Sequence, residues 1–202
     1  MHQYPSDVAF TPAVKAIQEA RGSREAYARV EQGNGWQTTI TDQLAEFLSG
    51  LDMFYLGTAN ANGQPYIQYR GGPRGFLKVV DEQTLGFADF GGNAQYISYG
   101  NLTENPRAFL FLIDYERSRR IKLWGTARMI DDDPELLDRL RDPEYPGLPE
   151  RAVLFNVEAW DINCPQHIHK RYLKSQVEPI IDQLKARIEE LETELARFRD
   201  VE

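Results

Sequence analysis

The fold is decided by residues 62–100, which read NGQPYIQYRGGPRGFLKVVDEQTLGFADFGGNAQYISYG. The stretch holds three short strand-like runs separated by glycine-rich turns. Its cationic residues Arg70, Arg74 and Lys78 are spaced four apart, and the glycines between them allow a ligand to approach the backbone closely. The same three charges could also lie on a strand edge that faces water. Because glycines accompany them, the pattern favours a β-sheet surface that receives a flat, phosphorylated cofactor.

The strand pattern continues on both sides of this stretch. Asn62-Gly63 is a strong hairpin signal, because both residues tolerate positive φ. The apolar run from Phe109 to Tyr115 is typical of a buried strand, and Gly125 predicts a bend or bulge in a long strand. The expected strands are 54–59, 65–69, 76–80, 84–90, 109–115, 120–130 and 152–160.

Helices are expected on either side of these strands. Thr11-Pro12 predicts a helix start, because threonine caps a helix and proline suits its first turn. This helix should end near Val30, with Val14, Ile17 and Tyr27 on its buried face. The other expected helices are 41–50, which buries Leu44, Phe47 and Leu48, then 93–102 and 131–140.

Strands joined at short spacing through turns favour an antiparallel barrel over a doubly wound sheet. The sequence therefore predicts a β-barrel with flanking helices, an α+β fold. We expect an N-terminal helical arm over residues 1–43, a barrel domain over 44–174 and a C-terminal amphipathic helix over 175–202.

Composition narrows the possible partners. The 202-residue chain has a net charge of -8 and a pI near 5.0, which argues against nucleic-acid and anionic-membrane binding. It has no apolar run of transmembrane length. The only cysteine is Cys164, which excludes an intrachain disulfide. A soluble cytoplasmic protein is expected.

The C-terminal segment has a pattern of its own. Apolar residues recur there at alternating steps of four and three, which is the a/d seam of about three heptads. Charged side chains occupy the other faces. The segment is either a helix packed on its own barrel or a self-associating coiled coil, and the narrow stripe favours the coiled coil. The seam consists of Val177, Ile181, Leu184, Ile188, Leu191, Leu195 and Phe198.

Four segments between Leu44 and Tyr172 together resemble the pyridoxamine 5'-phosphate oxidase-like family. They are residues 62–65, 70–78, 92–98 and 120–127. The resemblance implies an antiparallel FMN-binding split β-barrel that works as a homodimer, with flavin at the subunit interface.

The resemblance also implies positions for the cofactor. Lys78 matches the lysine that ends the family's first flavin-contacting strand, residues 87–89 match the next strand, and Asn93 matches the start of the helix beside the phosphate. A helix N-terminus and cations are what a phosphate dianion needs. The implied cofactor-binding residues are Gln68, Tyr69, Arg70, Arg74, Leu77, Lys78, Ala88, Asp89, Asn93, Gln95, Lys122, Trp160 and Arg171.

The sequence departs from the oxidase proper at two places. Ala94 and Gln95 stand where the oxidase has arginine and lysine, so Arg70, Arg74 or Lys122 would have to serve the phosphate. His167 stands where the oxidase has an arginine that grips the substrate phosphate, while His169 and Arg171 match. His167 and His169 are the expected substrate-binding residues, and a neutral histidine is a weak phosphate clamp. Pyridoxamine phosphate is therefore not the expected substrate.

These features lead to an FMN-dependent oxidoreductase acting on a small organic molecule. One alternative is a flavin-binding carrier or sensor without turnover. Another is a barrel that binds a deazaflavin or haem, with His167 or His169 as axial ligand. Cys164, His167 and His169 also suit zinc by residue type, and a cysteine nucleophile beside a histidine is chemically possible. The sequence spacing supports neither the zinc site nor the cysteine nucleophile, so no metal ligand and no catalytic residue is assigned.

Overall fold

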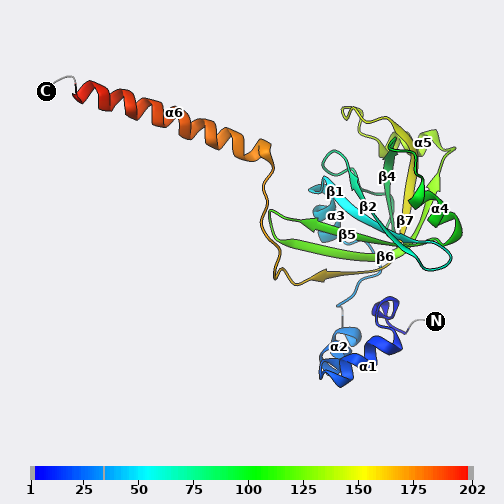
Figure 1. Cartoon of the computed structure of the whole chain (residues 1–202). Helices are drawn as coiled ribbons and strands as arrows, with labels where there is room; N and C mark the ends of the chain where they lie inside the picture. The colour runs from blue at the N-terminus through cyan, green and yellow to red at the C-terminus, as the bar shows by residue number, and fades with distance from the viewer. Residues whose placement is uncertain (1–2, 34, 200–202) are drawn as a thin grey trace. The chain divides into compact units, whose positions relative to one another are not determined.

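The computed structural model describes residues 3–33 and 35–199, with side chains described as far as residue 197 (Figure 1). The described part of the chain forms two compact units. The first comprises the residues up to Asp114 together with Arg119–Pro165, and the second comprises Tyr115–Ser118 and the residues from Gln166 onward.

One antiparallel sheet dominates the first unit. Within the described residues its strand order is β2-β1-β5-β6-β7-β4-β3, and the terminal strands β2 and β3 share no ladder, so the sheet is split rather than closed. The predicted antiparallel split barrel with flanking helices is confirmed. The strands are β1 (Met53–Ala59), β2 (Pro65–Gly71), β3 (Lys78–Val79), β4 (Thr84–Phe90), β5 (Arg107–Asp114), β6 (Arg119–Ile130) and β7 (Pro149–Asn163).

Alternation along the strands builds the core. In β1 Phe54 and Leu56 are fully buried, whereas their neighbours are half-buried, as expected for a strand with one face inward. Helix α3 (Asp42–Ser49) adds Leu44 and Leu48 to the same cluster. The Thr41 hydroxyl caps α3 by accepting a hydrogen bond from the amide of Leu44 at 3.3 Å.

Two predicted backbone features are confirmed. Gly63 has a φ of 81° in the turn between β1 and β2, where its amide donates to the carbonyl of Asn60. In β6 the register with β7 shifts between Trp124 and Gly125. A Cβ at Gly125 would lie 1.9 Å from the carbonyl oxygen of Asn156, so only glycine fits this bulge.

The prediction of one helix up to Val30 is wrong. The chain forms α1 (Pro12–Ala20) and α2 (Arg24–Gln32), preceded by the 3-10 turn η1 (Pro5–Val8). Gly22, with a φ of 76°, breaks the helix. The predicted apolar face is also wrong, because Ile17 is 63% exposed.

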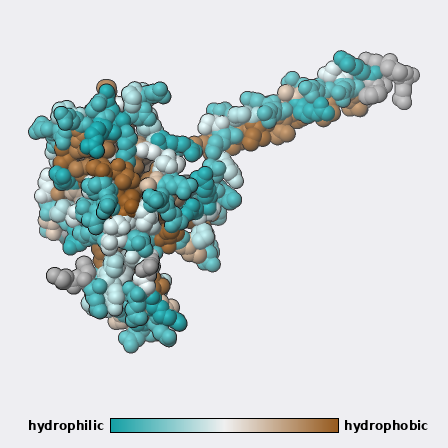
Figure 2. Space-filling model, turned by 180° about the vertical axis from the view of Figure 1, so that it is seen from behind, coloured by the Kyte–Doolittle hydropathy of each residue, from teal (hydrophilic) through white to brown (hydrophobic). Residues whose placement is uncertain are grey.

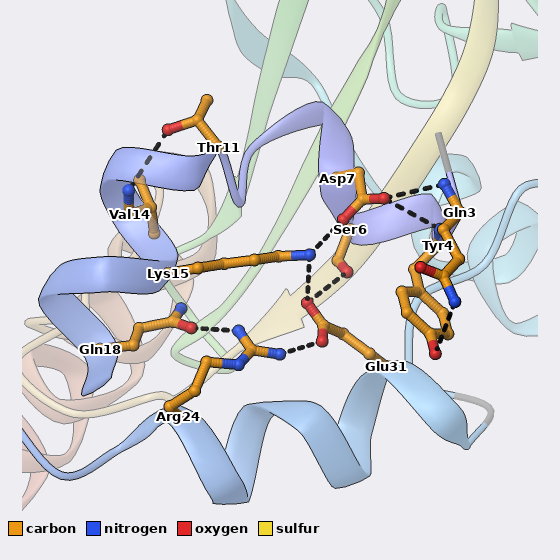
Figure 3. A network of polar contacts seen from close by, with 10 residues as sticks. All are labelled: Gln3, Tyr4, Ser6, Asp7, Thr11, Val14, Lys15, Gln18, Arg24 and Glu31. Atoms are coloured by element: carbon orange, nitrogen blue, oxygen red, sulfur yellow. Dashed lines mark hydrogen bonds and ion pairs between the residues drawn. The ribbon is translucent and has the colours of Figure 1, made fainter. Parts of the chain in front are cut away.

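Polar side chains hold the N-terminal arm together instead (Figure 3). Glu31 of α2 is buried and pairs with Arg24. The ammonium of Lys15 reaches both Asp7, at 2.6 Å, and Glu31, at 3.4 Å. Ser6 completes the cluster with a hydroxyl that donates to Glu31 at 3.4 Å. Because these buried groups are paired, their burial does not carry the penalty of an isolated charge.

A chain of aromatic rings runs from this arm to β6. Phe10 contacts Tyr27 and Trp36, each at a centroid distance of 5.3 Å. Trp36 in turn stacks on Trp124 of β6 at 4.8 Å. The arm is therefore joined to the sheet through Trp36.

The second unit contains α6 (Lys174–Arg199). Its first turn contacts the segment Tyr115–Ser118, since the side-chain amide of Gln176 donates to Glu116 at 3.0 Å. Phe198 of the predicted seam belongs to the residues whose side chains lie outside the described part. None of the described helices is both long enough and apolar enough to cross a membrane.

Candidate functional site

The gap in the sheet between β2 and β4 contains two adjoining pockets. We call one the strand pocket; it has a volume of about 460 Å³. The other, the loop pocket, is smaller and lies toward the loop that follows β4. Both share Gln68, Arg70, Asp89 and Phe90. The strand pocket is further lined by Asp52, Tyr69, Gly71, Gly72, Phe76, Phe87, Ala88 and Tyr145, and the loop pocket by Tyr66, residues 92–99, Met129, Glu150 and Arg151.

An ion pair spans the gap where the pockets meet. Arg70 of β2 and Asp89 of β4 bond through Nη1 and Oδ1. Burial raises the pKa of the Asp89 carboxyl, although the charges of Arg70 and Arg151 act in the opposite direction. The guanidinium of Arg70 also lies 6.0 Å from the centroid of Phe87. Its Nε is buried and has no hydrogen-bond partner among the described residues.

Arg151 is a site residue that the sequence analysis missed. It pairs with Asp89 at 3.4 Å, Asp131 at 2.9 Å and Glu150 at 3.1 Å, and its guanidinium lies over Tyr99 at 5.1 Å from the centroid. Asp89 and Arg151 face each other across the β4–β7 ladder. Nothing local marks Arg151, because its role depends on a pairing between strands far apart in sequence.

The loop before α4 (Ile97–Glu104) corrects another expectation. The helix begins at Ile97 and not at Asn93. Ala94 and Tyr96 have φ values of 56° and 52°, in the left-handed region that non-glycine residues rarely adopt. This backbone cannot continue the helix toward its N-terminus. Asn93 instead accepts a hydrogen bond from the amide of Gln95 at 3.3 Å.

Polar side chains connect α4 to the sheet beside the loop pocket. The Ser98 hydroxyl donates to Gln68 at 2.6 Å, and the Asn101 amide donates to Thr58 at 3.0 Å. These bonds fix the start of α4 against β1 and β2. Of the sequence-predicted cofactor residues, the structure brings Gln68, Tyr69, Arg70, Ala88, Asp89, Asn93 and Gln95 together around the two pockets.

Three residues of the β2–β3 region lie elsewhere. The ammonium of Lys78 donates to the carbonyls of Arg139 and Arg141, at 3.0 and 3.1 Å, and so binds the C-terminal end of α5 (Pro134–Leu140). Leu77 belongs to the core. Arg74 is exposed and lines neither pocket.

Lys122 and Trp160 are likewise outside the pockets. Lys122 pairs with Asp161 at 3.6 Å and lies over the rings of Trp36 and Trp124. Trp160 is buried, and its indole N–H donates to the carbonyl of Thr39 at 2.8 Å. Both residues therefore hold structure together.

The C-terminal candidates belong to the second unit. His167 has a φ of 65°, and the guanidinium of Arg171 lies 4.3 Å from the ring centroid of Tyr115. His169 is exposed. Among the residues described, no three histidine, cysteine, aspartate or glutamate side chains form a group that would hold a metal ion.

Comparison with solved structures found similar proteins. HupZ from Group A Streptococcus is 19% identical, with 66% of this chain and 99% of that chain covered and a TM-score of 0.51. A variant of HupZ is 21% identical, with 61% and 99% covered and a TM-score of 0.50. An FMN-binding protein from Syntrophomonas wolfei is 15% identical, with 72% and 97% covered and a TM-score of 0.46. At these identities the HupZ likenesses concern the fold alone.

The sequence itself matches a family model. None of the curated proteins compared with the chain is significantly similar to it. The family model described as pyridoxamine 5'-phosphate oxidase matches residues 40–164, which is more than half of the 202 residues. The match covers the whole sheet and the loop beside both pockets. The chain thus belongs to the pyridoxamine 5'-phosphate oxidase family, as the resemblance of its motifs indicates.

Proposed function

We propose that this protein binds FMN in the gap between β2 and β4 and uses it, as a homodimer, to oxidise or reduce a small organic substrate. The observation that carries the proposal is the buried Nε of Arg70, a hydrogen-bond donor without a partner among the described residues, at the meeting point of two pockets. Such a donor costs free energy unless a ligand or water satisfies it.

The strand pocket suits a planar ring. Its volume of about 460 Å³ falls within the range of roughly 300–1,000 Å³ typical of ligand sites. Phe76 and Phe87 supply apolar surface, and Tyr69 and Tyr145 add aromatic rings with polar tips. Aromatic lining with a few polar groups is the usual composition of a site for a flat ligand.

The phosphate half of the site is less favourable. Arg70 and Arg151 are the cations that line the loop pocket, and both already pair with Asp89. Arg151 also pairs with Asp131 and Glu150. A dianion would therefore compete with carboxylates for these guanidinium groups. Burial raises the pKa of Asp89, so protonating this carboxyl when a phosphate takes its partners costs less than it would for an exposed carboxyl.

When bound, FMN supplies a ring that accepts or donates a hydride. The residues of this chain then bind and orient it. Arg70 offers Nε as a donor, and the rings of Phe76 and Phe87 exclude water from one side.

Exposed side chains of β2 support a homodimer with the pocket close to the subunit interface. Ile67 is 70% exposed, and Tyr69, which also lines the strand pocket, is 59% exposed. Tyr69 makes an edge contact with Tyr55 of β1, and Tyr55 lies beside Phe111 of β5. Large apolar side chains gathered on one exposed face are typical of an association surface. We expect Ile67→Lys to lower the dimer fraction in sedimentation velocity, whereas Val79→Lys on β3 leaves it unchanged.

The visible absorption spectrum tests the cofactor. The purified protein is measured before and after excess FMN is added and dialysed away. Flavin bands should persist after dialysis, and Arg70→Ala should lose them, while Arg21→Ala, which removes an exposed positive charge outside both pockets, keeps them. A protein that stays colourless under all conditions would contradict the proposal, and a Soret band would indicate haem instead.

A flavin-binding module without turnover is the second candidate. The three carboxylates around Arg151 favour it, because they leave the phosphate side without a surplus of positive charge. Bound flavin that neither NADH nor NADPH reduces, and that no small oxidant or reductant turns over, would support this module over the oxidoreductase.

A further inference from the structure

We propose that α6 pairs with the α6 of a second copy of this chain as a parallel, in-register, two-stranded coiled coil. The proposal concerns the second unit alone and does not depend on flavin binding. It assigns the apolar stripe of α6 to one occupant, the same stripe of a partner chain.

The stripe is continuous and exposed. The six seam residues from Val177 to Leu195 are between 36% and 60% exposed. Figure 2 shows a brown hydrophobic band along the helix, beside teal hydrophilic residues. A stripe that repeats every 3.5 residues is too narrow for a globular core face and fits a coiled-coil seam. Its described members are Val177, Ile181, Leu184, Ile188, Leu191 and Leu195.

The residue types at the seam favour two parallel strands. Ile181 and Ile188 occupy successive a positions, and Leu184 and Leu191 occupy the d positions between and after them. Isoleucine at a with leucine at d is the combination that selects parallel dimers. Pro179 falls at an f position, on the side away from the seam, so it does not interrupt the contact.

The flanking charges are complementary in the same arrangement. Arg187 is at g and Glu192 is at the following e position, and in a parallel pair each g residue faces the e residue of the next heptad of its partner. Within one chain Arg187 pairs with Glu190 at 2.7 Å. Both side chains are more than half exposed, so this ion pair contributes little to stability. Arg187 can therefore leave Glu190 and pair with Glu192 of the second copy at a small cost in free energy.

Symmetry is compatible with this pairing. A parallel, in-register pair of helices has its twofold axis along the coiled coil, so it closes a dimer and does not propagate a chain of subunits.

Three heptads are marginally stable in isolation. The full-length protein is therefore the right material for the test.

Site-specific cross-linking provides the test. In a full-length Cys164→Ser background, Leu191→Cys places one thiol at a d position, where two parallel chains bring identical residues together within the roughly 4.4–6.8 Å Cα separation that a disulfide requires. The control is Thr193→Cys, at an outward f position. Mild oxidation should convert Leu191→Cys to a covalent dimer on the order of tenfold faster than Thr193→Cys, because pairing raises the effective thiol concentration.

A charge exchange provides an independent readout that leaves the seam intact. In the Leu191→Cys protein, Arg187→Glu should slow cross-linking, because the new carboxylate would face the partner's Glu192. Adding Glu192→Arg should restore the rate. Equal rates at positions 191 and 193 would overturn the proposal, as would a charge reversal without effect. Either result is what α6 packed on its own barrel, or an antiparallel pair, would give.

Discussion

Arg70 and Asp89 join the two halves of the split sheet. Arg70 lies on β2 and Asp89 on β4, and these strands share no ladder. Both side chains are largely buried, so the pair is screened little by water. The ion pair fixes the distance between β2 and β4. It also neutralises the guanidinium of Arg70, the cation that a phosphate would need.

Replacing this carboxylate should therefore tighten flavin binding. Asp89→Asn keeps the shape, removes the negative charge and frees Arg70. We expect the FMN dissociation constant to fall on the order of tenfold, about 1.4 kcal/mol, in a fluorescence-quenching titration. The control is Asp81→Asn, in the turn between β3 and β4, which should leave the constant unchanged. A weaker complex in Asp89→Asn would mean that Asp89 itself contacts the flavin.

The same variant has a pH signature. Because burial raises the pKa of Asp89 above its ordinary 3.8, the folded protein takes up this proton more readily than the unfolded chain. The cost of the buried charge is therefore relieved as pH falls through the folded-state pKa. FMN affinity of the wild type should rise over the same window, and Asp89→Asn should lose that dependence.

Asp7 should give the opposite pH dependence. Its hydrogen bond with Lys15 lowers its pKa from 3.8 to about 2, so between these values the unfolded chain binds more protons and stability decreases as pH falls. Asp7→Asn should cost ~0.2–1 kcal/mol at pH 6, as partly exposed ion pairs do. The difference in Tm between wild type and variant should shrink as pH falls toward 2. A constant difference would show that the ion pair contributes nothing.

A substitution of Lys78 can distinguish a structural role at the end of α5 from a role in flavin binding. Lys78→Met removes the two hydrogen bonds to the carbonyls at the end of α5, and we expect a loss of about 1 kcal/mol, or a fall in Tm of roughly 2–4 °C. Calorimetry measures this loss, and a flavin titration of the same variant measures any direct contact. Unchanged Tm with weakened FMN binding would restore the cofactor role that the family motif implies.

Gly125→Ala tests the bulge in β6. The added Cβ would meet the backbone oxygen of Asn156, which no side-chain rearrangement can relieve, so we expect a loss of about 3 kcal/mol or more. Gly100→Ala is the matched control. Nothing lies within 4 Å of its Cβ position in α4, and the substitution should stabilise the helix by about 0.5–1 kcal/mol. Denaturant unfolding of both variants compares the two changes, and equal effects would rule out the steric explanation.

Local sequence signals predicted most of the sheet. The apolar strand runs, the Asn-Gly turn and the Gly125 bulge are each set by a few adjacent residues, and the structure has all of them. The N-terminal arm could not be predicted in this way. Its buried residues include Gln18 and Glu31, whose burial depends on partners in other segments and not on their own polarity.

Some residues of the candidate site could likewise be predicted from local sequence, and others could not. Gln68, Arg70 and Asp89 follow from strand positions and family motifs. Arg151 and the side chain of Lys78 do not, because a strand pairing and a helix end decide where each one points. The left-handed residues Ala94 and Tyr96 shift the start of α4, and neither residue type signals such a backbone.

The stacked indoles of Trp36 and Trp124 give the molecule an internal spectroscopic reporter. The two indoles, with centroids 4.8 Å apart and planes inclined at 27°, are packed in a fixed and asymmetric environment, which should give a near-ultraviolet circular dichroism signal. One ring belongs to the arm and the other to the sheet. That signal should disappear when the arm detaches, while the far-ultraviolet signal of the strands persists, so the two events can be followed separately in one unlabelled sample.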